Sequence, residues 1–191
     1  LQLLVDYLGG SRPVGLSLEM LKTRPAQVLG ALLVGLRGAD DPAVAEVRQL
    51  NAPLVIVNRY WPESDLSFVS VDYMRAETSA VKYLCGLGHR KVAFVSKGPV
   101  DYCWCRQRRE GYLAGLAAEG CPTDPRFIFR APNAALAAEM LIRQAPDVTA
   151  ICAANDAVAI ELIAELKKHG LRVPQDMSVI GFDNDERLPT P

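Results

Sequence analysis

The 191-residue sequence has neither a long apolar run nor an excess of one charge. No apolar stretch approaches the roughly 20 residues that a membrane-spanning helix needs, so we expect no membrane partner. The formal net charge of −1 gives no sign of a broad basic surface for nucleic acid. The opening residues, LQLLVDYLGG, contain no basic segment and no small-residue cleavage site, so we expect no signal peptide.

The sequence is also poor in residues that build disulfide frameworks and metal sites. It has five cysteines, an odd number without regular spacing, which favours reduced thiols in a cytoplasmic protein. Cys103 and Cys105, in the stretch CWC, could bind a soft metal. A zinc site usually takes four nitrogen or sulfur ligands, however, and the only histidines, His89 and His169, lie in unrelated loops. We therefore expect no metal and no cofactor.

Motifs of common enzyme classes are missing as well. There is no G-x-G-x-x-G or G-x-x-x-x-G-K-[ST] loop for nucleotide phosphates, and no G-x-S-x-G nucleophile elbow. His89, in the turn GLGHRKV, is interpreted as structural, and Cys105 has no evident histidine partner that could activate it. We expect no catalytic residues and a protein that is not an enzyme.

What the sequence does contain is a regular alternation of short apolar runs and amphipathic stretches. Runs such as ALLVG and PLVIV are apolar throughout, which is typical of parallel strands covered on both faces. We predict strands at Leu1–Val5, Ala31–Gly35, Pro53–Val57, Phe68–Val71, Lys91–Val95, Phe127–Arg130, Ala150–Ala153 and Met177–Phe182. We predict helices at Leu16–Lys22, Pro42–Leu50, Tyr73–Leu87, Arg106–Glu119, Ala134–Gln144 and Asp156–His169. The alternation predicts an α/β fold with right-handed crossovers.

Ligands of such sheets bind beyond the carboxyl ends of the strands, which draws attention to the stretch DYCWCRQRREGY. Its arginines, Arg106, Arg108 and Arg109, open a predicted helix, where the helix dipole disfavours positive charge. We therefore expect another group to hold at least one of them. They form no long basic stripe, so a nucleic-acid patch is disfavoured.

Several stretches, in this order, resemble the effector-binding core of LacI/GalR-type bacterial transcription regulators. VSVDYMRAETSAVKYLCGLGHRKVAFVS is similar to the family's crossover, helix and following strand, and RQRREGYLAGLAAEG to its R-x-x-G-Y helix. AICAANDAVAIELIAELKKHGLRVPQDMSVIGFDN carries the A-N-D-x-x-A and V-P-x-D-x-S-V-x-G-F-D patterns. VLGALLVGL and APLVIVNR resemble the strands before them. The resemblance extends from Val28 to Asn184.

This resemblance implies a periplasmic-binding-protein-like type I fold, in which two doubly wound parallel-sheet subdomains face each other across an effector cleft. We expect an N-terminal subdomain over residues 1–71 and a C-terminal one over 72–191, both incomplete. The family works as homodimers and contacts operator DNA through a helix-turn-helix domain, which we do not find in this sequence. A cytoplasmic regulator core that binds a sugar-like effector is therefore expected. A periplasmic sugar receptor of a transport system and a redox protein built around CWC remain alternatives.

The resemblance also implies effector contacts within the DYCWCRQRREGY stretch. Arg108, three residues before Gly111, matches the family's effector-binding arginine, whose planar fork suits vicinal hydroxyls or a carboxylate. Tyr102 and Trp104 match loop positions that reach the effector, where an aromatic face can stack on a sugar or a purine. Trp104 could equally pack against its own subdomain.

Three further candidates follow predicted strands. Asp183 follows SVIGF, where it could accept hydrogen bonds from ligand hydroxyls or only shape a turn. Asn155 could contact the effector or cap the next helix. Asn58, after PLVIV, matches a polar contact from the other subdomain. The sequence has Ala131 and Pro132 where many family members carry a pocket-closing aromatic residue, so Trp104 could supply the stacking surface instead.

Overall fold

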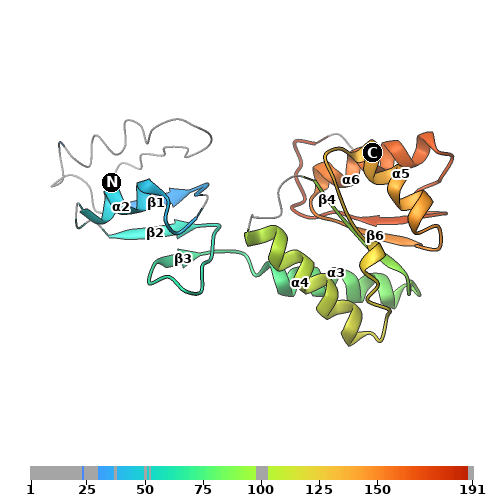
Figure 1. Ribbon diagram of the computed structural model, residues 1–191, viewed down its shortest axis with the longest axis horizontal. Coiled ribbons are helices and arrows are strands. Elements are labelled where there is room, and N and C mark those ends of the chain that lie inside the picture. Colours follow the sequence, from blue (N-terminus) through green and yellow to red (C-terminus); the bar gives the residue numbers. More distant parts are fainter. Residues whose placement is uncertain are drawn as a thin grey trace. The chain divides into compact units, whose positions relative to one another are not determined.

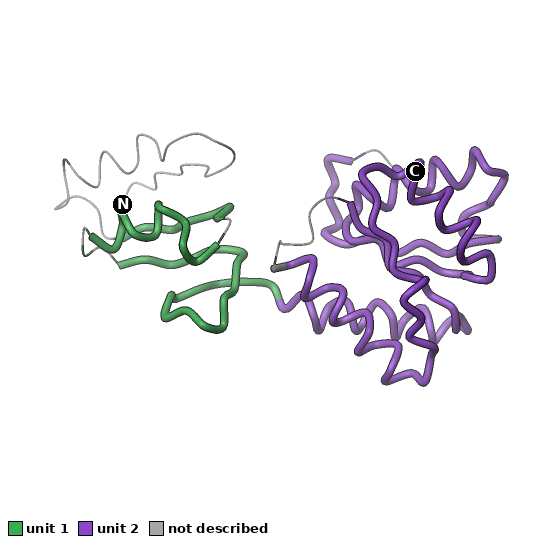
Figure 2. The backbone as a smooth tube through the Cα atoms, viewed as in Figure 1, with its two compact units in different colours: residues 1–71 green, residues 72–191 purple. Residues whose placement is uncertain are grey.

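The chain divides into two compact units in the computed structural model, residues 1–71 and residues 72–191 (Figure 2). The structure describes residues 23, 30–36, 38–49, 51, 53–97 and 103–188. The predicted strand Leu1–Val5, the predicted helix Leu16–Lys22 and the candidate Tyr102 lie outside these residues. Each unit contains a parallel sheet with helices, which confirms the predicted α/β class.

Unit 1 contains a three-stranded parallel sheet in the order β1-β2-β3. Its elements are β1 (Ala31–Val34), α2 (Pro42–Gln49), β2 (Leu54–Val57) and β3 (Ser67–Val69). Helix α2 begins at a proline, whose fixed φ suits the first helical position, and the Asp41 carboxylate accepts a hydrogen bond from the Ala43 amide. The apolar side of α2 packs on the sheet around the buried Leu33, Val47 and Ile56.

Unit 2 contains a four-stranded parallel sheet in the order β5-β4-β6-β7. The strands are β4 (Val92–Lys97), β5 (Ile128–Ala131), β6 (Ala150–Ala153) and β7 (Ser178–Ile180). The helices are α3 (Tyr73–Gly86), α4 (Cys103–Ala118), α5 (Ala134–Gln144) and α6 (Asp156–Lys168), with a short 3₁₀ turn η2 (Pro125–Phe127) before β5. Strands β4 and β6 are buried almost throughout, as their unbroken apolar sequences predict.

The helices of unit 2 lie on both faces of this sheet, α3 and α4 on one and α5 and α6 on the other (Figure 1). Three of them begin at a side chain that accepts a hydrogen bond from the backbone three residues later. These N-caps are Asp72 for α3, Asn133 for α5 and Asn155 for α6. Each satisfies an amide that would otherwise have no helical partner, which fixes where the helix starts.

Several predicted bounds differ from the structure, among them the end of β3, which is at Val69 rather than Val71. Helix α4 begins at Cys103 rather than Arg106, so the CWC stretch is helical rather than a loop. Strand β7 ends at Ile180 rather than Phe182, because the chain turns at Asp183 and Asn184, which have φ of 102° and 54°. Across the described ranges, no helix is both long enough and apolar enough to cross a membrane.

Candidate functional site

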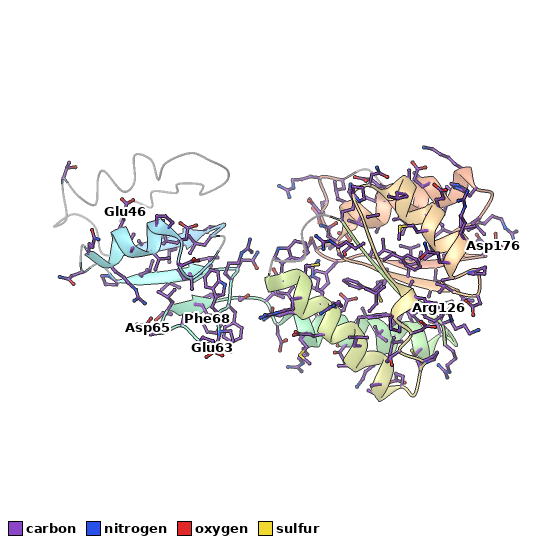
Figure 3. All side chains as sticks on the ribbon, viewed as in Figure 1. Glu46, Glu63, Asp65, Phe68, Arg126 and Asp176 are labelled. Atoms are coloured by element: carbon purple, nitrogen blue, oxygen red, sulfur yellow. The ribbon has the colours of Figure 1, made fainter. Side chains whose placement is uncertain are left out.

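The candidate site lies in unit 2, at the carboxyl edge of its sheet. Arg108 reaches this edge from α4, Tyr73 from the first turn of α3, and Phe182 and Asp183 from the turn after β7. In parallel sheets this edge collects the loops that follow the strands, and ligands bind there. Figure 3 shows other charged side chains of unit 2, such as Arg126 and Asp176, at the outer surface.

Arg108 is unusual because its side chain is buried, with only 3% of the residue exposed. Its guanidinium carbon lies 3.6 Å from the centroid of the Phe182 ring and 4.8 Å from that of Tyr73. The Trp104 ring centroid is 5.1 Å away. Aromatic faces attract a desolvated cation, so these three rings form a cage around the charge. The cage is the group that holds an arginine against the helix dipole.

Asp183 completes the cage with a negative charge. Its Oδ1 lies 3.3 Å from Nη2 of Arg108, and its side chain is 52% exposed. Burial lowers the pKa of Arg108, whereas the charge of Asp183 raises it again. The turn from Asp183 to Arg187 lines a surface pocket of about 460 Å³. Asp183 therefore shapes a turn, as one of the two interpretations predicted, and it also pairs with Arg108; its contact with a ligand stays a prediction.

One donor of the guanidinium is not satisfied. Within the part of the chain that the structure describes, Nε of Arg108 is the buried side-chain donor that lacks a hydrogen-bond partner. Leaving such a donor unpaired costs about 1–3 kcal/mol. The site therefore combines an unmet donor with a half-exposed carboxylate acceptor.

The turn after β7 is tied to the start of α6. The Asp156 amide donates to the Phe182 carbonyl at 2.9 Å, and Oδ2 of Asp156 accepts from the Asp185 amide at 2.8 Å. A Cβ at Gly181 would lie only 2.1 Å from Oδ1 of Asp156, so a side chain there would displace the Asp156 carboxylate. Asp156 thus fixes the backbone that presents Phe182 and Asp183. From the sequence, Asp156 was expected only to be the first residue of a helix, although it lies in the A-N-D motif.

Asn155 and Asn58 each lie just after the carboxyl end of a strand, Asn155 after β6 and Asn58 after β2. Oδ1 of Asn155 accepts from the Val158 amide at 2.9 Å, which is the capping role, and this leaves the amide nitrogen for other partners. Asn58 follows β2 in unit 1 with φ of 61°. Its backbone N–H donates a hydrogen bond to the Val69 carbonyl at 2.7 Å.

Trp104 is placed differently from the prediction. The expectation that it lies on a loop was wrong, because it is in the first turn of α4, one turn before Arg108, and its ring faces the guanidinium. The neighbouring Cys105 is buried, and burial raises the pKa of its thiol above the usual value. That thiol is therefore not an activated nucleophile.

Phe182 was not predicted as a site residue, and two further site residues, Tyr73 and Glu77, were missed as well. They are four residues apart on α3 and so share a helix face, and both are buried, Glu77 with only 2% exposed. Burial raises the pKa of Glu77 to about 7, while the Cys152 thiol and the Arg108 charge lower it in part. A glutamate within the apolar stripe of α3 was the signal that could have revealed it.

His89 lies at the opposite edge of the sheet. Nδ1 is 2.9 Å from Oγ1 of Thr149, just before β6, and Nε2 is 3.0 Å from Oγ of Ser178, the first residue of β7. The imidazole thus links the amino ends of two strands, which is consistent with the structural interpretation.

Comparisons with known proteins agree with this architecture. The profile of the periplasmic binding protein-like domain matches residues 81–190. The HTH-type transcriptional repressor CytR of Escherichia coli (strain K12) is 35% identical over 162 residues, which are 83% of this chain and 47% of CytR. This chain therefore spans about half the length of the curated relatives that it matches.

Solved structures give the same result. A sugar-binding transcriptional regulator of the LacI family from Escherichia coli, complexed with phosphate, superposes with a TM-score of 0.76 and 26% identity, covering 88% of this chain and 60% of that one. The transcriptional regulator CelR in complex with cellobiose superposes with a TM-score of 0.73 and 31% identity, covering 87% and 53%. The chain belongs to the periplasmic binding protein-like domain family, and within it to the effector-binding cores of LacI/GalR-type regulators.

Proposed function

We propose that this chain is the effector-sensing part of a DNA-binding transcription regulator and that unit 2 contributes a site for a hydroxyl-rich small molecule of the sugar class. The observation that carries the proposal is the buried Arg108, whose Nε lacks a partner beside the half-exposed Asp183. A guanidinium donates to adjacent hydroxyl oxygens, and a carboxylate accepts from hydroxyl protons, so the pair is complementary to a polyol.

The names of the relatives support a sugar as the effector class. One structural neighbour is described as a sugar-binding regulator, and another was solved with cellobiose. The relatives named here are transcription regulators rather than transport receptors, which favours the regulator over a periplasmic receptor. We accordingly assign the chain to the cytoplasm, and we assign operator binding to a helix-turn-helix domain outside the stretch that this chain covers.

The mechanism that we infer is a population shift. Units 1 and 2 act as the two subdomains of the effector core, Arg108, Asp183, Trp104 and Asn155 contact the effector from unit 2, and Asn58 contacts it from unit 1. Tyr102 belongs to the same proposed set. An effector that binds both units stabilises one arrangement of them, and a homodimer passes the change on to the DNA-binding domains. Trp104 contributes mainly by keeping the guanidinium in place, since its ring already faces Arg108.

Thermal shift and calorimetry with a panel of ligands test the site, because a ligand that prefers the folded state raises the melting temperature. The panel contains cellobiose, glucose, galactose, ribose and free nucleobases. We expect a sugar to stabilise the wild type. We expect Arg108→Met to abolish the effect and Arg108→Lys, which keeps the charge but loses the fork, to weaken it.

Matched variants separate binding from folding. Arg106→Met removes an exposed arginine of the same helix and leaves the ligand effect unchanged. Asp183→Asn keeps a residue that tolerates positive φ, and it reduces binding; it also lowers stability, because the buried Arg108 loses a charged partner. A ligand response of Arg108→Met equal to that of the wild type would show that the site is assigned wrongly.

A further inference from the structure

Two ionisable side chains are buried together beneath the candidate site. Among the described residues, the buried charged groups are Glu77, on α3, and Arg108, on α4. The two helices approach closely at this level, where a Cβ on Gly111 would lie 3.0 Å from Cβ of Glu77 and 2.3 Å from the Met74 carbonyl oxygen. A long polar side chain is thus enclosed where two helix backbones nearly touch.

Two groups near Glu77 stabilise its charged form, the Cys152 thiol and the Arg108 guanidinium. From α4 it feels the Arg108 charge, and from β6 the Cys152 thiol, which is a weak hydrogen-bond donor. Glu77 acts in turn on Arg108, together with Asp183 and the Tyr73 phenol. A carboxylate is costly in such an interior unless it is hydrogen-bonded or paired, so the Cys152 thiol and the Arg108 charge both favour the ionised form of Glu77.

The Arg108 charge therefore acts on two carboxyl groups in different environments. Asp183 is half-exposed, so water stabilises its charge, whereas Glu77 is enclosed. A buried carboxyl can exist in either protonation state, and which state it takes changes the net charge around the guanidinium. With both carboxyls ionised, the group of three carries a net charge of −1, and with Glu77 protonated the Arg108–Asp183 pair is neutral.

We propose that Glu77 is a positioning residue for Arg108: as a carboxylate it serves as the inner counter-ion of the guanidinium, and by taking up a proton it leaves Asp183 as the only carboxylate partner. The consequence for ligand binding rests on the function proposed above. When Glu77 is ionised, the ion pair between Asp183 and Arg108 is weaker, and Asp183 accepts hydrogen bonds from ligand hydroxyls more readily. When Glu77 is protonated, a neutral polyol must compete with a tighter ion pair. Because burial raises the pKa of Glu77 to about 7, both states are populated near neutral pH.

The first test needs no ligand. Carbon-13 NMR of the glutamate side chains, with the Glu77 signal assigned by its loss in Glu77→Gln, gives the titration midpoint. We expect a midpoint near 7 in the wild type and an upward shift of about one pH unit in Arg108→Met, because the cation no longer favours the carboxylate. Arg108→Lys keeps the charge, so its Glu77 midpoint is expected to stay closer to that of the wild type. A midpoint near the ordinary value of 4.5, or one that is equal in the wild type and Arg108→Met, overturns the proposal.

The second test follows the cage itself. With Trp61→Phe as the background, Trp104 is the remaining tryptophan, and its ring faces Arg108. We expect its emission to change with pH at the Glu77 midpoint and to stay flat between about pH 6 and 8 in Glu77→Gln. Glu110→Gln, an identical change at an exposed glutamate of α4, retains the wild-type curve. A Glu77→Gln curve that superimposes on the wild type contradicts a positioning role.

The third test uses cellobiose as the probe. We expect its affinity to fall between pH 8 and pH 6 in the wild type, by about tenfold for each unit by which cellobiose lowers the Glu77 midpoint, and to be constant in Glu77→Gln. If cellobiose binds with no pH dependence, Glu77 does not act on the ligand. If cellobiose does not bind at all, the proposed ligand class fails for that sugar, and the two ligand-free tests still decide on Glu77.

Discussion

A single residue, Glu77, makes a large pH-dependent contribution to the stability of unit 2. Moving this carboxyl from water into the interior of unit 2 raises its pKa from 4.5 to about 7, mainly through burial. The folded state therefore binds the Glu77 proton more tightly than the unfolded state does. It follows that the protonated form favours folding and that the advantage is lost when the solution removes the proton.

The first prediction at this scale compares wild type with Glu77→Gln over a pH series. The favourable contribution of Glu77 is complete below about pH 4.5 and declines until the pH passes the folded-state pKa of about 7. We expect the wild type to lose on the order of 3 kcal/mol relative to Glu77→Gln across this window, and nothing further above it. Urea unfolding at each pH measures the difference. Parallel stability curves for the two proteins would contradict it.

At the level of residues, the sequence indicated two of the proposed ligand contacts, Arg108 and Asp183, but not the carboxyl group of Glu77 that is buried beneath them. Arg108 and Asp183 were identified through motif resemblance, and they meet at 3.3 Å. Glu77 escaped notice because helical periodicity tells which residues share a face, not what the opposite helix brings to it. Its environment depends on α4, 31 positions away in the sequence, and on β6.

At the scale of elements, the close contact between α3 and α4 is what brings Glu77 to Arg108. Two glycines of α4 permit it: a Cβ on Gly111 would lie 2.3 Å from the Met74 carbonyl oxygen, and one on Gly115 would lie 2.7 Å from Cβ of Val81. These contacts involve the backbone and the first side-chain atom of α3, which cannot rotate away. The helices must separate if either glycine gains a side chain.

The second prediction therefore concerns Gly111→Ala. We expect it to lower the free energy of unfolding by about 1–3 kcal/mol, because overpacking displaces the helix, and to weaken the pH response of Trp104. Gly86→Ala is the matched control: it lies in the last turn of α3 with no atom within 4 Å of the added Cβ. That change is expected to be neutral or slightly stabilising. Urea unfolding of both variants checks this, and equal stability of Gly111→Ala and the wild type would be evidence against it.

Elements with unbroken apolar runs or clear caps were predictable. Strands β4 and β6 and helix α6, with its Asn155 cap and Gly170 stop, lie close to their predicted positions. The start of α4 was not predictable, since its arginines oppose the helix dipole, and the rings that surround Arg108 come in part from outside the helix. Strand order was equally hidden, because β4 pairs with both β5 and β6 through contacts distant in sequence.

At the scale of the whole molecule, the two units differ in size. Unit 1 comprises residues 1–71, whereas unit 2 comprises the longer stretch of residues 72–191. Buried apolar surface is the main favourable term in folding, and a small domain retains little net stability after its loss of conformational entropy. Unit 1 is therefore expected to be the less stable part.

The third prediction uses the two tryptophans, which belong one to each unit: Trp61 packs against buried apolar residues of unit 1, and Trp104 against those of unit 2. Single-tryptophan variants, Trp104→Phe and Trp61→Phe, report each unit separately in urea. We expect the Trp61 signal to change at lower urea and with a smaller m-value, since m scales with the surface exposed on unfolding. Circular dichroism of both variants should then show two transitions, the larger one coinciding with Trp104. Coincident midpoints for the two tryptophans would mean instead that the units unfold as one cooperative body.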